Sequence, residues 1–163
     1  MTPHSLLFLV LALLSVCSME PKKLPDKVTS LLENVSEVVA VSIDPESKVR
    51  KKGSDGETTY FGYNIFDRGT LKEEDAKKLI NAVTSAIEES DGSTRACFLP
   101  RHGLSIRNGK RMVDFLICFQ CLHVKVFIDG KNIGEFPISS EKQQMINLIL
   151  DRNKIMRPGK PNE

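Results

Sequence analysis

Three cysteines in the second half of the chain have the residue types and the spacing that could carry chemistry. Cys97, Cys118 and Cys121 lie close in sequence to His102 and His123. Thiolates and imidazoles bind metals, and pairs of thiols form or exchange disulfides. Three interpretations follow: a structural disulfide from Cys97 to Cys118 or Cys121, a zinc site that joins the thiolates to His102 or His123, and a redox-active Cys-x-x-Cys. We favour the disulfide, because an exported chain retains such bonds.

A predicted hairpin sets the geometry of these cysteines. Asn108-Gly109 lies between two apolar segments, a pattern typical of a two-residue hairpin turn. With these two residues as the loop, Arg107 faces Lys110, and the same register places Cys97 opposite Gln120. Strand alternation then points Cys97 and Cys118 to the same face of the sheet. Cys121 then points to the other face unless a bulge intervenes. A strand through this segment also splays the two sulfurs of the Cys-x-x-Cys apart, which argues against zinc.

A second candidate is a ligand site formed by Arg101, His102 and Asp114. Arg101 could hold an anion with its guanidinium fork while His102 donates a hydrogen bond, and Gly103 would let a ligand come close. Asp114 could instead pair with Arg101 or His102 across the hairpin. The basic residues around this hairpin are also typical of a solvated sheet edge whose charges oppose aggregation, which is the simpler interpretation.

The same residues carry a resemblance to a known group of proteins. One segment runs from Cys97 to Gly103 as Cys-Phe-Leu-Pro-Arg-His-Gly, and a second runs from Asp114 to Cys121 and ends in Ile-Cys-Phe-Gln-Cys. They resemble the motif pair Cys-Phe-x-Pro-Arg-His-Gly and Asp-x-x-Ile-Cys-Phe-x-Cys of an uncharacterised family of exported bacterial proteins. The resemblance covers roughly residues 60–128 and implies a group without an established activity. Gln120 stands where that family often has an acidic residue, so the resemblance implies no general acid there.

The first 18 residues are expected to direct export. They contain no Lys, Arg, Asp or Glu, and Leu6 to Leu14 is an apolar run that is too short to cross a bilayer but suits the core of a signal peptide. The following residues up to Cys17 also resemble a bacterial lipobox, in which Cys17 would be lipidated. Lipoboxes usually have Gly, Ala or Ser where Val16 stands, so simple cleavage is favoured. The mature protein is expected in the periplasm, in the cell envelope or outside the cell.

Composition restricts the partners and the number of domains. The net charge of +2 argues against a nucleic-acid partner, and no other long apolar run exists, so a lipid on Cys17 is the expected route to a membrane. The length predicts a single α+β domain over residues 26–153. A signal peptide (1–18) and a linker (19–25) precede this domain, and a disordered tail (154–163) follows it.

One helix is the clearest local prediction. Residues 71–89 carry apolar residues at helical spacing with most charges on the other side, and Thr70 and Glu73 form a capping box in front of them. Weaker versions of this pattern predict a short helix after Asp26 and a last helix that ends near Leu150. The last helix should bury Met145, Leu148 and Ile149.

The remaining elements are strands. Early strands are predicted at 37–43, ended by Asp44-Pro45, and at 59–66. The turns at Asn108-Gly109 and Asp129-Gly130 then predict a three-stranded antiparallel meander. The element order is α-β-β-α-β-β-β-α. The expected fold is α+β, a mainly antiparallel sheet with helices packed on one face.

These observations favour a non-enzymatic, exported cell-envelope protein that binds a small ligand or a partner. The chain has no nucleophile elbow, phosphate loop, zinc-protease helix or close pair of carboxylates. No cofactor is expected under this interpretation. The alternative is a metal-binding or thiol-dependent envelope protein, with zinc as the expected metal, that uses Cys97, Cys118 and Cys121 with His102 or His123.

Overall fold

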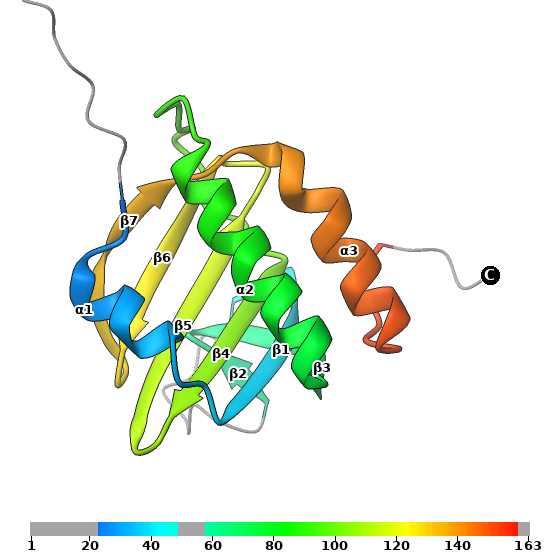
Figure 1. The fold of residues 1–163 in the computed structure, drawn as a ribbon. Coiled ribbons are helices and arrows are strands. Elements are labelled where there is room, and N and C mark those ends of the chain that lie inside the picture. Colours follow the sequence, from blue (N-terminus) through cyan, green and yellow to red (C-terminus); the bar gives the residue numbers. More distant parts are fainter. Residues whose placement is uncertain (1–22, 49–57, 160–163) are drawn as a thin grey trace, which may run out of the picture.

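Apolar strands joined by tight turns build an antiparallel sheet (Figure 1). The computed structural model describes residues 23–48 and 58–159. Within this part seven strands form one curled sheet in the order β2-β3-β1-β4-β5-β6-β7, and the predicted α+β class is confirmed. The strands are β1 (Glu37–Lys48), β2 (Thr59–Tyr60), β3 (Tyr63–Thr70), β4 (His102–Asn108), β5 (Arg111–Cys118), β6 (His123–Ile128) and β7 (Lys131–Pro137). The helices are α1 (Asp26–Thr29), α2 (Glu73–Glu88) and α3 (Gln143–Arg152), with short 3-10 helices at Ser30–Leu32 and Ser140–Lys142.

Strands β4 to β7 follow one another as a meander, with one strand more than the sequence predicted. Asp129-Gly130 forms the second turn as predicted, with φ of 49° and 76°. In the first hairpin Asn108 pairs with Arg111, so the loop is Gly109-Lys110 and the predicted register is wrong by two residues. A shift by an even number leaves each side chain on its predicted face of the sheet.

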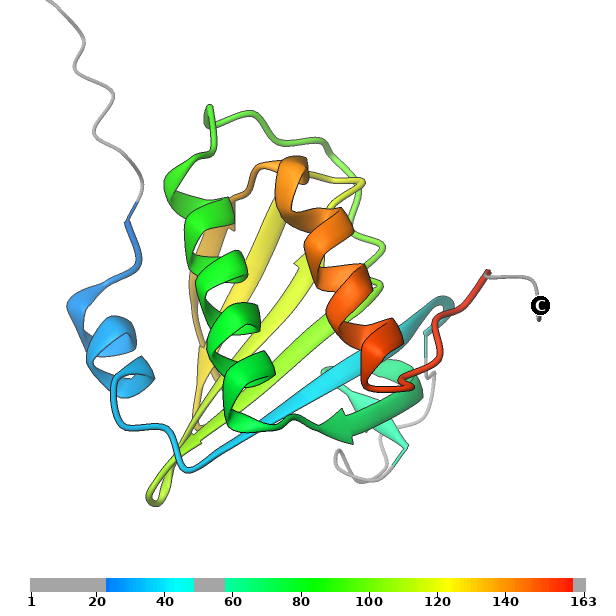
Figure 2. The same cartoon turned by 45° about the vertical axis from the view of Figure 1, so that its right-hand side comes forward.

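Helix α2 forms because one of its sides is apolar and its first turn is acidic, which suits the positive end of a helix. Its N-cap is Lys72, and no side chain caps it, so the predicted capping box is wrong. Thr70 is instead the last residue of β3, where it pairs with Val39. Figure 2 shows α2 and α3 running side by side across the sheet.

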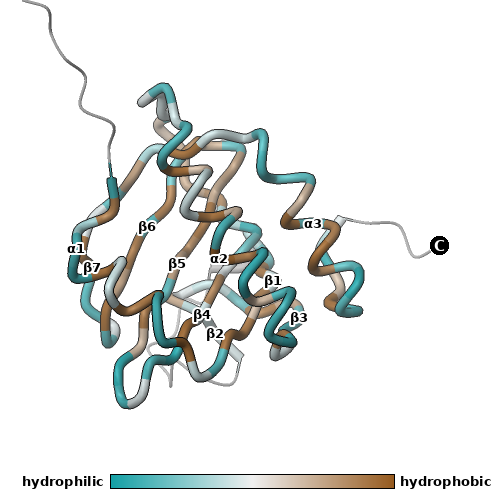
Figure 3. The backbone as a smooth tube through the Cα atoms, in the orientation of Figure 1, coloured by the Kyte–Doolittle hydropathy of each residue, from teal (hydrophilic) through white to brown (hydrophobic). Residues whose placement is uncertain are grey.

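Strand alternation gives the sheet two buried clusters with different partners. The main core joins apolar residues of α2 and α3 to strand residues that include Leu104, Ile106, Phe115, Ile117, Val124 and Val126. The strand residues that alternate with these form a smaller cluster, which contains Val41, Ile43, Tyr63, Leu116 and Phe127. Figure 3 shows the apolar residues concentrated along the central strands, while the tip of the β4–β5 hairpin is polar.

The first strands differ from the prediction. Strand β1 continues through Asp44-Pro45 to Lys48, because its register against β3 shifts after Asp44, and a proline is tolerated at such an irregularity. The segment predicted as one strand at 59–66 is a hairpin, in which Phe61 and Gly62 form the turn with φ of 47° and 82°. The turn therefore places Phe61 against the smaller cluster, where its ring stacks on that of Phe127.

The two ends of the domain also differ. Leu24, from the predicted linker, and Ile155, from the predicted tail, are both buried in the main core. In α3 the predicted burial of Ile149 is confirmed, but that of Met145 and Leu148 is wrong, since both are exposed. The side of α3 that faces the core contains Ile146 and Leu150 together with Ile149. Ile146 thus takes the place in the core that was predicted for its neighbour Met145.

Several predictions fall on parts of the chain that the structure does not describe. The signal peptide with Cys17, the first part of the predicted linker and the last four residues of the predicted tail lie outside the described residues. In the described ranges no helix has the length and the apolar character needed to cross a membrane.

Candidate functional site

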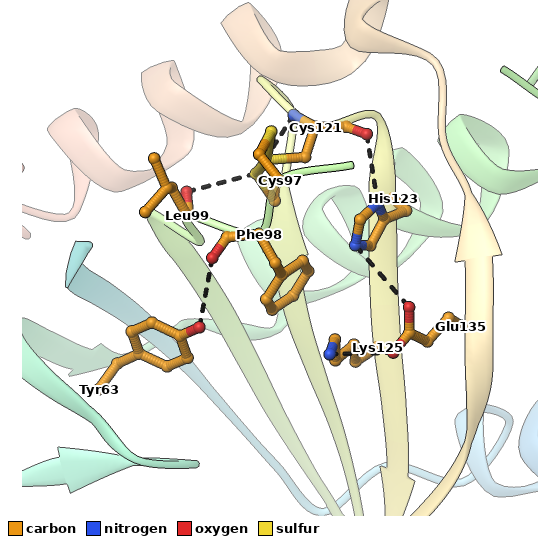
Figure 4. A network of polar contacts seen from close by, with 9 residues as sticks. Tyr63, Cys97, Phe98, Leu99, Cys121, His123, Lys125 and Glu135 are labelled. Atoms are coloured by element: carbon orange, nitrogen blue, oxygen red, sulfur yellow. Dashed lines mark hydrogen bonds and ion pairs between the residues drawn. A yellow bond between two sulfur atoms is a disulfide. The ribbon is translucent and has the colours of Figure 1, made fainter. Parts of the chain in front are cut away.

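The three cysteines meet at the end of the sheet where β5 passes into β6 (Figure 4). The sulfur of Cys121 contacts the sulfurs of both Cys97 and Cys118, and the corresponding Cα–Cα distances are 5.5 and 5.3 Å. A sulfur atom forms one disulfide at a time, so a Cys97–Cys121 disulfide leaves Cys118 as a thiol. This geometry agrees with the predicted bridge from Cys97 to one of the other two cysteines.

A turn brings Cys118 and Cys121 together. Strand β5 ends at Cys118, and Leu122 takes a left-handed conformation with φ of 57° while its N–H donates to the carbonyl of Phe119 at 3.2 Å. The backbone N–H of Cys121 then points at the sulfur of Cys118, at 3.2 Å. The expectation that a strand would splay these two sulfurs apart is therefore wrong.

Hydrogen bonds hold the connection between α2 and β4 against this turn. The N–H of Arg95 donates to the carbonyl of Cys121 at 2.9 Å, and its guanidinium donates to the carbonyl of Gln120 at 3.1 Å. On the other side the hydroxyl of Tyr63 donates to the carbonyl of Phe98 at 3.3 Å. Burial raises the pKa of Tyr63 from its ordinary value, so this hydroxyl remains a donor at neutral pH.

A cleft of about 490 Å³ opens beside Cys97, and we call it the Phe98 cleft. The ring of Phe98 stacks on that of His123 at 4.7 Å between centroids, and the ammonium of Lys125 lies 4.4 Å from the Phe98 centroid. Lys125 also pairs with Glu135 at 2.9 Å. Figure 4 shows Phe98 and His123 next to Cys97 and Cys121, with Lys125 and Glu135 further from the sulfur atoms. The cleft therefore offers an aromatic surface with charges of both signs.

Sequence reasoning did not identify Phe98, Lys125 or Glu135 as site residues. If the pairing of β6 and β7 continued without interruption from their turn, Lys125 would pair with Gly134. The register shift after Val126 pairs it with Glu135 instead. The opposite charges on these two residues were the one signal that could have predicted the pair.

His102 lies on the other side of the sheet from the cysteines. Its Nε2 is 2.8 Å from the side-chain oxygen of Asn147 in α3, which accepts a hydrogen bond, so the proton resides on Nε2. Among the described residues Nδ1 of His102 and the hydroxyl of its strand neighbour Ser42 are buried without a partner. Burial lowers the pKa of His102 to about 4, helped by Arg157 and Arg101 and opposed by the Asn147 hydrogen bond.

The predicted ligand set is divided between the two sides of the sheet. Arg101 lines a small cleft with His102 on the α3 side. Asp114 points to the smaller cluster, where it accepts a hydrogen bond from the hydroxyl of Tyr60 at 3.1 Å, and burial raises the pKa of Asp114. The close approach expected at Gly103 is made by Tyr60, because an added Cβ would lie 2.7 Å from its ring.

The predicted metal ligands are also only partly together. His123 lies on the side of the cysteines, but its Nδ1 is 3.2 Å from the carbonyl of Cys121 and its Nε2 is 3.8 Å from Glu135. Within residues 23–48 and 58–159 no group of three or more His, Cys, Asp or Glu residues has an arrangement that could hold a metal ion. No family model, curated protein or solved structure matches this chain.

Proposed function

We propose that this chain is an exported cell-envelope protein that binds a short peptide-like ligand in the Phe98 cleft. The observation that carries the proposal is the ring of Phe98, which contacts both His123 and Lys125 at the wall of an open cleft. A ring already held by two such contacts loses little freedom when a ligand packs on it, so it is well suited to binding.

The charges of the cleft indicate the class of ligand. Arg95 and Lys125 supply positive charge at the rim, and Glu135 supplies negative charge. A short peptide with a free carboxylate and a free amine matches this pattern better than a simple anion or an uncharged molecule.

We also propose that the helices cover one face of the sheet, which leaves the opposite face to carry the cleft.

Binding of short charged peptides tests this proposal. In a calorimetric titration with a panel that includes S-methylglutathione, at least one member should bind saturably. Replacing Phe98 with Ala should weaken that binding by about tenfold or more, because the aromatic surface is lost. Leu99→Ala is the matched control, since Leu99 is an exposed apolar neighbour that does not line the Phe98 cleft. Equal affinities for the wild type and Phe98→Ala would contradict the assignment.

Export has its own test. The charge-free segment before residue 19 and the bridging geometry of the cysteines both support an oxidising compartment. Mass spectrometry of the native protein should find a chain that begins after residue 16 to 18. A diacylglyceryl group on Cys17 would select the lipid-anchored form, and an intact Met1 in a cytoplasmic fraction would contradict export.

A further inference from the structure

We propose that the three cysteines form a thiol–disulfide relay that releases Cys97 into the Phe98 cleft. There Cys97 forms a mixed disulfide with a small or peptide disulfide. The inference rests on the proposed function, because the same cleft holds the reacting molecule. It adds a chemical class to the ligand and a covalent step to its binding.

Burial separates the cysteines into two kinds. Cys118 and Cys121 have exposed fractions of 1% and 0%, so a dissolved disulfide does not reach either sulfur in the folded protein. Cys97 is half-buried and lines the cleft. Of these three sulfurs, that of Cys97 is therefore the one that an incoming molecule can meet.

The backbone permits two alternative bridges. The Cα–Cα distances of 5.5 Å for Cys97 and Cys121 and of 5.3 Å for Cys118 and Cys121 both lie within the usual range for a disulfide. Because Cys121 contacts both partners, either bridge can form without moving a strand. The Cys97–Cys121 bridge leaves Cys118 as a buried thiol, whereas the Cys118–Cys121 bridge leaves Cys97 as a thiol. Only the second arrangement gives the cleft a reactive sulfur.

The internal step exchanges one disulfide for another. The thiolate of Cys118 attacks the sulfur of Cys121, a Cys118–Cys121 bond forms, and the Cys97–Cys121 bond breaks. Cys97 leaves with the bonding electron pair and takes up the proton that Cys118 gave up. One disulfide and one thiol are present before and after, so the step needs neither an oxidant nor a reductant.

Local contacts favour both ends of this step. The N–H of Cys121 lies 3.2 Å from the sulfur of Cys118, where it stabilises the attacking thiolate. Before the proton is lost, the Cys118 thiol donates a hydrogen bond to the carbonyl of Leu99 at 3.3 Å. At the other end the departing thiolate of Cys97 enters a cleft that contains the cations of Arg95 and Lys125. Positive charge near a thiolate lowers its basicity and makes it a better leaving group.

The second step captures the ligand. The Cys97 thiol gives up its proton, its thiolate attacks a disulfide R–S–S–R in the cleft, a Cys97–S–S–R bond forms, and R–S⁻ leaves and takes up a proton. The buried Cys118–Cys121 bridge meanwhile keeps the other two sulfurs out of the reaction. The protein would thus carry a thiol compound on Cys97 while its interior remains oxidised.

Glutathione disulfide is a direct probe of the relay. The full chain with Cys17→Ser, prepared without reductant, is incubated with glutathione disulfide under native conditions, alkylated and mapped by peptide mass spectrometry. We expect glutathione on Cys97 together with a Cys118–Cys121 bridge. Cys118→Ser, which retains a Cys97–Cys121 bridge and has no thiol to start the exchange, should take up no glutathione while its circular dichroism spectrum is unchanged.

Three results would overturn the relay. They are glutathione on Cys118, no adduct until the protein is denatured, and three free thiols with one bound zinc ion, which would establish the coordination alternative. The proposed function fails separately. S-methylglutathione has no sulfur that can exchange, so binding of this compound without an adduct from glutathione disulfide removes only the relay. The opposite outcome has two parts. Glutathione is found on Cys97 to the same extent in the wild type and in Phe98→Ala, and no peptide binds saturably. That outcome removes only the proposed cleft function.

Discussion

Replacing Val83 with Asp should lower the free energy of unfolding by about 3–5 kcal/mol, the usual cost of leaving an unpaired charge in a core. Val83 lies in the middle of α2 with an exposed fraction of 2%, and it belongs to the main core. A carboxylate there loses its water and meets apolar side chains. Urea unfolding followed by circular dichroism measures the change, and the transition midpoint should fall without a change in its slope.

The control for this variant is Asn81→Asp. Asn81 lies in the same helix but is exposed, so the same carboxylate remains in water there and the midpoint should move by less than about 0.5 kcal/mol. Equal unfolding curves for Val83→Asp and Asn81→Asp would mean that the core-facing side of α2 is assigned to the wrong residues.

Acid should destabilise the protein through His102 by up to about 3 kcal/mol. The pKa of His102 is about 4 in the folded chain, against an ordinary value of 6.5. Between these values the unfolded chain binds a proton that the folded chain does not bind, so the folded state loses stability as the pH falls from 6.5 to about 4. Above pH 6.5 both states are neutral at this residue, and its full contribution to stability is present.

Urea unfolding at a series of pH values measures this effect. His102→Gln removes the titrating ring but retains a group that can bond to Asn147, so the variant should show a flatter dependence of stability on pH between 6.5 and 4. If the slopes of the wild type and His102→Gln coincide, His102 does not titrate in the way that its burial indicates.

Local patterns in the sequence predicted much of the fold. Helix α2 followed from apolar spacing, and the Asp129-Gly130 turn followed from its residue types, because each signal is local and strong. The β2–β3 hairpin had no such signal, since Phe61 is not a usual residue at a positive φ. Strand β1 passes Pro45 only because of a register shift that depends on its partner strand. Tertiary contacts decided these two elements.

The site was predicted less completely. The cysteines meet because Leu122 adopts a left-handed conformation, and leucine gives no sign of this in a sequence. Strand alternation could have separated His102 from Cys118: His102 pairs with Ile117, so its side chain shares a face with Ile117 and not with Cys118. The Phe98 cleft depends on a bulge in β7 and on a connection that has no regular structure. Neither feature has a periodic pattern.

The central position of β1 has a consequence for the order of folding. The meander from β4 to β7 closes through short turns, whereas β1 must pair Glu37 with Arg107 across the intervening hairpin and helix. Closing long loops costs more entropy, so the meander can form first and β1 can then complete the sheet. Until β1 docks, the edge of β4 has unpaired backbone groups. A chain caught at that stage would be the one most ready to pair with another copy and aggregate.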